Sequence, residues 1–145
     1  MKTRIILCAL SLCLATALFA HTGVKDPDVL KRMHTMKLVA DDMKALNGIA
    51  KDPVFDTARV APLAASLLDH ARNIEPSFKL KASDPKSEAR ETIWTDWDGF
   101  LKSAAAMESA VEALTKVETA DEFQAAFTAL GGTCTACHEV YRIKN

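Results

Sequence analysis

The amino-acid sequence predicts an all-α protein that folds as one antiparallel four-helix bundle. In four separate stretches, apolar residues recur at alternating spacings of three and four, which is the pattern of one helix face and not of a strand. The composition agrees, because 49% of the 145 residues are hydrophobic while only five are glycine and five are proline. This length suffices for one domain and is too short for two ordinary domains. Mostly short connections between the stretches favour the bundle.

Residues 1–20 have the three-part layout of a secretory signal peptide. Lys2 and Arg4 form a positively charged start, and an apolar run up to Phe19 follows, with a small residue after it. The run is too short to span a bilayer comfortably and no second apolar stretch follows, so we expect no retained membrane anchor. The expected mature domain is residues 21–145, exported to the periplasm.

The placement of the cysteines makes the C-terminal pair the main functional question. Cys8 and Cys13 lie within the predicted signal, whereas Cys134 and Cys137 remain in a mature chain that enters an oxidising compartment. Each signal cysteine directly follows a leucine, which argues against a lipid anchor. An Ala-x-Ala pattern that ends at Ala17 offers an earlier cleavage site, and both signal cysteines would be removed in that case too.

The first helix is expected over residues 29–43, where the apolar face repeats in the four-three pattern. The Asn47-Gly48 pair is a stop signal, so we expect the helix to end there. The inward face consists of Val29, Met33, Met36, Ala40 and Met43.

The second helix is expected over residues 60–74, closed by Pro76. Pro62 leaves the start of this helix open between two positions. Either the helix begins near Ala61, with the proline in its first turn, or it begins at Asp56 and carries a kink.

The longest connection is expected over residues 75–90, which contain Pro76, an Asp84-Pro85 pair and several charges but no strand pattern. A long apolar face over residues 93–114 then predicts the third helix. This face consists of Ile93, Trp97, Phe100, Ala104, Met107, Val111 and Leu114.

A capping box of Thr119 and Glu122 predicts the start of the fourth helix. Its apolar face consists of Phe123, Phe127, Leu130, Cys134, Cys137 and Tyr141. The Gly131-Gly132 pair within it costs about 1 kcal/mol of helix propensity per glycine relative to alanine. Glycines at these positions would allow a bulky group to approach the backbone closely, because they have no side chain. Both cysteines are therefore expected to face the interior of the bundle.

The motif Cys134-Thr135-Ala136-Cys137-His138 has the spacing that attaches a c-type haem. Two thiols one helical turn apart can form thioether bonds with the two vinyl groups on one porphyrin edge, and the adjacent His138 can then ligate the iron. A dithiol redox pair would be expected beside a βαβ pattern, which this sequence lacks. A zinc site would need further ligands, and His21, His34 and His70 form no such cluster. We therefore expect one covalently attached haem c.

With this motif in place, the chain resembles the class II c-type cytochromes, the cytochrome c-prime family. Members of that family carry the haem motif near the C-terminus of a four-helix bundle. The resemblance covers essentially the whole mature chain and includes the stretch CTACHEVYR from Cys134 to Arg142, the Ile93-Trp94 pair and Arg32 on the first helix. The C-terminal position of the motif is the feature that selects this family.

The resemblance implies that Met36 is the sixth ligand of the iron. In the family, the residue four positions after the first-helix arginine faces the distal side of the iron, and here that residue is Met36. Methionine at this position is typical of the low-spin branch, whereas a bulky non-ligating residue leaves the iron five-coordinate and open to small gases. Met36 also lies on the inward face of its helix, and a thioether can ligate haem iron. Two alternatives stay open: Met33 as the ligand, or Met36 as a residue that only fills the core.

The resemblance also implies roles for two arginines. Arg32 would approach a haem propionate, for which a guanidinium is well suited. Arg142, one turn after His138, would be the family's proximal-side arginine. The alternatives are a solvated arginine on the first helix and an ordinary residue at the end of the fourth helix.

We expect a periplasmic electron carrier and not an enzyme, in which His138 and Met36 ligate the iron of the single haem. The main alternative is a five-coordinate cytochrome that binds small gases such as nitric oxide, and a weaker one is a dithiol oxidoreductase without haem.

The expected partners are redox proteins that bind weakly and transiently. A formal net charge of −1, without a run of one sign, argues against nucleic acid. The resemblance implies a possible homodimer through the first two helices. Charged residues could equally make that surface solvent-facing, namely Lys31, Lys37, Asp41, Asp42 and Lys44.

Overall fold

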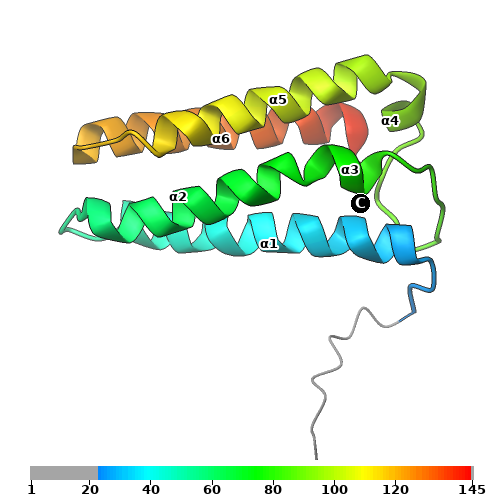
Figure 1. Ribbon diagram of the computed structural model, residues 1–145, viewed down its shortest axis with the longest axis horizontal. Helices are drawn as coiled ribbons and strands as arrows, with labels where there is room; N and C mark the ends of the chain where they lie inside the picture. Colours follow the sequence, from blue (N-terminus) through cyan, green and yellow to red (C-terminus); the bar gives the residue numbers. More distant parts are fainter. Residues whose placement is uncertain (1–22, 145) are drawn as a thin grey trace, which may run out of the picture.

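Four long helices lie side by side in the computed structural model, which describes residues 23–144 (Figure 1). The long helices are α1 (Pro27–Ala50), α2 (Thr57–Arg72), α5 (Trp97–Leu114) and α6 (Ala120–Tyr141), and two short helices, α3 (Ile74–Phe78) and α4 (Thr92–Thr95), lie between α2 and α5 in the sequence. Figure 1 shows α1 and α2 as one antiparallel pair beside the pair of α5 and α6. The predicted four-helix bundle is therefore confirmed. The predicted signal peptide, residues 1–20, lies outside the described residues.

Helix α1 begins after a capping residue and extends beyond the predicted C-terminal end. The Asp26 carboxylate caps the helix by accepting two backbone N–H hydrogen bonds, at 2.9 and 3.0 Å. The helix continues through Asn47-Gly48 to Ala50, so the predicted stop was wrong. Leu46 and Ile49 are 0% and 5% exposed. Their burial outweighs the weak helix propensity of the Asn-Gly pair.

The earlier of the two possible starts of α2 is the correct one. The Asp56 carboxylate caps α2 by accepting a hydrogen bond from the Ala58 N–H at 2.9 Å, and Pro62 lies inside the helix. The predicted closure by Pro76 was wrong, because α2 ends at Arg72. Pro76 instead lies in the first turn of α3, where a missing N–H costs no intrahelical hydrogen bond.

The predicted third helix is divided at Asp96. The backbone leaves the helical region there, with φ −128° and ψ 54°, so α4 ends and α5 begins. The Asp96 carboxylate accepts a hydrogen bond from the Tyr141 hydroxyl at 2.7 Å. A Cβ atom on Gly99 would lie 2.6 Å from the same hydroxyl oxygen, so the close approach of α6 requires glycine at this position.

The capping box at the start of α6 is confirmed. The Glu122 N–H donates to Thr119 Oγ1 at 3.3 Å, and the Thr119 N–H donates to Glu122 Oε2 at 3.1 Å. A Cβ atom at Gly131 or Gly132 would meet no other atom within 4 Å. No contact within the described protein therefore requires these two glycines. That a bulky group approaches the backbone at this point stays a prediction.

The connection between α3 and α4 covers residues 79–91, close to the predicted range. It contains no strand, but Ala89 forms an isolated antiparallel bridge with Arg142. The Arg90 N–H also donates to the Tyr141 carbonyl at 2.9 Å. This pairing attaches the connection to the C-terminal end of α6.

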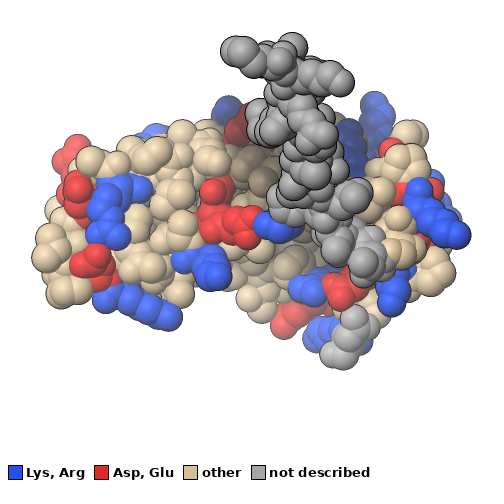
Figure 2. All heavy atoms as spheres, turned by 90° about the horizontal axis from the view of Figure 1, so that it is seen from below, with Lys and Arg blue, Asp and Glu red and all other residues tan. Residues whose placement is uncertain are grey.

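The two helix pairs pack together mainly through α2 and α5, whereas α1 and α6 make little contact. The largest fully buried side chains include Leu46, Leu67, Val111, Phe123 and Leu130, which come from all four long helices. On the face shown in Figure 2, side chains of both charges are interspersed. Within residues 23–144, no helix has the length and apolar character needed to cross a membrane.

Candidate functional site

A cavity of about 600 Å³ lies where α1 and α6 pack least closely. Its walls are mostly apolar and come from α1, α3, α5 and α6, from Ile93 of α4 and from the connection before α4. All of the predicted site residues line it, namely Arg32, Met36, Cys134, Cys137, His138 and Arg142. The structure therefore brings together residues that are separated by most of the sequence.

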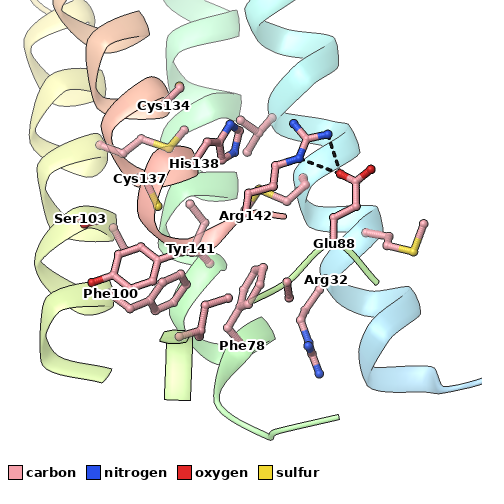
Figure 3. Close-up of a pocket in the computed structure, with 18 of the residues that line it drawn as sticks. Arg32, Phe78, Glu88, Phe100, Ser103, Cys134, Cys137, His138, Tyr141 and Arg142 are labelled. Carbon is pink, nitrogen blue, oxygen red and sulfur yellow. Dashed lines mark hydrogen bonds and ion pairs between the residues drawn. The ribbon is translucent and has the colours of Figure 1, made fainter. Parts of the chain in front are cut away.

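The haem motif occupies one wall of the cavity. Figure 3 shows Cys134, Cys137 and His138 along neighbouring turns of α6. Both thiols are free and half-buried, and burial raises the pKa of each, so both are protonated at neutral pH. His138 lies on the exposed side of the cavity wall, and its partial desolvation there, assisted by the positive charge of Arg142, lowers its pKa. The neutral imidazole is the form that can ligate a metal.

Methionines of two helices contribute soft ligand atoms to the same cavity. Met33 and Met36 line it from α1 together with Met43, and Met107 lines it from α5. Met36 is half-buried and packs against the hydrophobic core. Because α1 and α6 lie on different sides of the cavity, a side chain of α1 and His138 can approach one bound group from two directions.

Arg32 is buried, so its interpretation as a solvated helix residue was wrong. It is 3% exposed, and its guanidinium carbon lies 4.9 Å from the centre of the Trp94 ring and 5.6 Å from that of Phe78. Nη2 donates to the carbonyls of Leu80 and Ala82, each at 3.2 Å. Nε and Nη1 are buried without a hydrogen-bond partner. Burial lowers the pKa of Arg32.

Arg142 forms an ion pair that the sequence analysis missed. Its Nε and Nη2 lie 2.7 and 2.5 Å from Glu88 Oε2. Figure 3 shows this pair beside the ring of His138. Glu88 also lines the cavity, and its charge opposes that of Arg142 at the imidazole. Glu88 lies in the connection before α4, outside any apolar repeat, so nothing in the sequence pattern marked it.

Tyr141 is a second site residue whose partner was missed. Burial and the hydrogen bond to the Asp96 carboxylate raise the pKa of its hydroxyl to about 12. Its ring packs edge-on against Phe100, with centroids 5.4 Å apart, and Phe100 in turn packs against Phe78 at 5.2 Å. These contacts fix the end of α6 that carries His138.

The residues of the cavity fit a covalently attached haem. The volume lies within the range of pockets that enclose small molecules and cofactors. The apolar walls suit a porphyrin ring, and the two free thiols are one helical turn apart.

A family model described as Cytochrome C′ matches residues 28–142. This chain belongs to the cytochrome c′ family. The match includes every predicted site residue of this cytochrome, from Arg32 to Arg142, and nearly the whole described bundle. Membership of the family implies a c-type haem.

Relatives of this cytochrome carry two kinds of name. A cytochrome c′ of Pararhodospirillum photometricum is 34% identical over 116 residues, which are 77% of this chain and 92% of the relative. A cytochrome c-556 of Agrobacterium fabrum is 30% identical over 120 residues, which are 81% of this chain and 82% of the relative. The structure described as oxidized R. palustris cytochrome c556 superposes with a TM-score of 0.71 at 27% identity, covering 83% of this chain and 99% of that chain. Both kinds of relative match, so the sixth ligand stays a prediction.

Proposed function

We propose that this cytochrome is an electron carrier, with one haem c attached through Cys134 and Cys137 and with His138 and Met36 as the iron ligands. The observation that supports this proposal is that Met36 on α1 and His138 on α6 line the same apolar cavity. When bound, the haem supplies one-electron exchange between ferric and ferrous iron.

The side chains of the cavity have separate tasks in this function. His138 offers a neutral imidazole nitrogen, because partial desolvation disfavours the charged form. Met36 offers a thioether sulfur, which carries no ionisable proton and can therefore ligate iron without first losing one. Arg32 lines the cavity and, as the family resemblance implies, provides the positive charge for a propionate. The mostly apolar walls would pack against the porphyrin ring, and no substrate bond is made or broken.

An absorption spectrum of the purified holoprotein tests the proposal. Low-spin bands in both oxidation states, with little change on addition of carbon monoxide, are expected when both axial positions are occupied by protein ligands. High-spin bands and rapid uptake of carbon monoxide would support the five-coordinate, gas-binding alternative instead. A folded protein without a Soret band would contradict both and leave the dithiol alternative.

Covalent attachment through both cysteines gives a further expected result. Mass spectrometry of the mature protein should show the chain without residues 1–20 plus the mass of one haem, and the haem should survive extraction with acidified acetone. Cys134→Ala and Cys137→Ala should each impair maturation and lower the yield of holoprotein, because each leaves one vinyl group without its thioether. A variant that yields holoprotein as well as the unmodified chain would show that its cysteine is not an attachment point.

Export and weak partner binding complete the proposal. The predicted signal peptide directs the chain to the periplasm, where a c-type cytochrome exchanges electrons with other redox proteins. Such encounters bury small interfaces and are short-lived.

A further inference from the structure

We propose that Glu88 balances the charge beside the iron ligand of this cytochrome, because its carboxylate pairs with the guanidinium of Arg142 next to His138, offsets that positive charge and lowers the reduction potential of the bound iron. This inference rests on the proposed function for the presence of haem and for His138 as a ligand. It does not depend on the identity of the sixth ligand.

Glu88 forms an ion pair with the guanidinium of Arg142. Nε and Nη2 of Arg142 lie 2.7 and 2.5 Å from the same oxygen, Glu88 Oε2. The side chain of Glu88 is 40% exposed and that of Arg142 is 52% exposed. Ion pairs in such contact with solvent contribute little to the stability of a fold. The main consequence of the pair is therefore electrostatic, because the negative charge of Glu88 offsets the positive charge of Arg142 at the imidazole of His138.

The backbone keeps Glu88 at this place independently of its charge. The Ile143 N–H donates to the Glu88 carbonyl at 2.8 Å, and the Arg90 N–H donates to the Tyr141 carbonyl at 2.9 Å. The Thr92 hydroxyl also donates to a carbonyl of the last turn of α6, at 3.1 Å. A neutral residue at position 88 can keep all of these bonds, so the effect of the carboxylate can be separated from that of the fold.

Both charges act on the wall of the cavity that carries His138. Glu88, Arg142 and His138 all line the cavity, and Figure 3 shows the guanidinium next to the imidazole ring. A negative charge near iron favours the ferric state, which carries one more positive charge than the ferrous state, and a positive charge does the opposite. Glu88 offsets Arg142, so its neutralisation leaves an unbalanced positive charge near the ligand.

The test is the reduction potential of the holoprotein, measured by spectroelectrochemical titration. Glu88→Gln should raise the equilibrium constant for reduction about threefold to tenfold, which corresponds to about 28 to 59 mV for a one-electron couple. Arg142→Gln should shift the potential in the opposite direction, and the double variant should lie close to the unmodified protein. Hydrogen exchange at the amides of Arg90 and Ile143 should be unchanged in Glu88→Gln.

Glu91→Gln is the matched control. Glu91 belongs to the same connection and forms an ion pair with Lys81, but it is 61% exposed and does not line the cavity. Its neutralisation removes the same charge and should leave the potential unchanged.

Several outcomes would overturn the inference. One is an equal shift in Glu88→Gln and Glu91→Gln, because the effect would then belong to the general surface charge. A second is a reduction potential of Glu88→Gln that is unchanged or lower than that of the unmodified protein. A third is faster hydrogen exchange at the amides of Arg90 and Ile143 in this variant, because Glu88 would then be needed for the structure itself. A chain that matures without covalent haem would overturn the proposed function together with this inference, whereas a normal holoprotein with an unchanged potential overturns this inference alone.

Discussion

Met36→Ala should convert the iron of this cytochrome from low-spin to high-spin and open it to carbon monoxide. A thioether in the sixth position must leave before carbon monoxide can bind, so the apparent affinity falls with the fraction of open sites. With about 1% of the sites open in the unmodified protein, removal of the thioether should strengthen binding about hundredfold. Absorption spectra of the ferric and ferrous forms and a carbon monoxide titration measure both changes.

Met33→Ala is the matched control for this substitution. Met33 lines the same cavity from the preceding turn of α1, so its loss removes a similar volume of side chain. The variant should lose packing energy, at most about 2–5 kcal/mol for a buried methionine, and should keep the low-spin spectrum. A high-spin spectrum in Met33→Ala together with a low-spin one in Met36→Ala would identify Met33 as the ligand. High-spin iron in the unmodified protein would show that neither methionine ligates it.

Apolar periodicity predicted the four long helices, but the predicted inward face of α1 is only partly buried. Val29 is buried, Met33, Met36 and Met43 are half-buried along the cavity, and Ala40 is exposed. The same periodicity put Met36 and the haem motif on inward faces, and those faces line one cavity. The capping box at the start of α6 was also a reliable signal, since the Thr119 side chain accepts a hydrogen bond from the Glu122 N–H. The start of α2 at Asp56 was left open by the sequence.

The features that the sequence could not predict depend on contacts between distant residues. The break at Asp96 is accompanied by a hydrogen bond to Tyr141, 45 residues away. The ion pair of Glu88 with Arg142 joins residues 54 positions apart. No local pattern carries this information, because the partners are brought together only when the connection before α4 packs against the end of α6.

Loss of the haem should leave a chain that keeps its helices but lacks fixed tertiary packing. Without the haem, the mostly apolar walls of the half-open cavity lose their packing partner and face water. The whole stability of an ordinary domain is only about 5–15 kcal/mol, so this exposed apolar surface should be enough to loosen the fold. The Cys134→Ala/Cys137→Ala double variant without haem should therefore retain its far-ultraviolet circular dichroism and lose its near-ultraviolet signal.

Arg32 should lower the stability of the apoprotein. Two of its nitrogens, Nε and Nη1, are buried without hydrogen-bond partners, and this costs free energy that an apolar side chain at the same position would not cost. Arg32→Met in the apoprotein should consequently tighten the packing, measured as a more cooperative calorimetric transition. The same substitution in the holoprotein should weaken the structure, because it removes the proposed propionate partner. An apoprotein whose thermal transition matches that of the holoprotein would show that the haem is not part of the core.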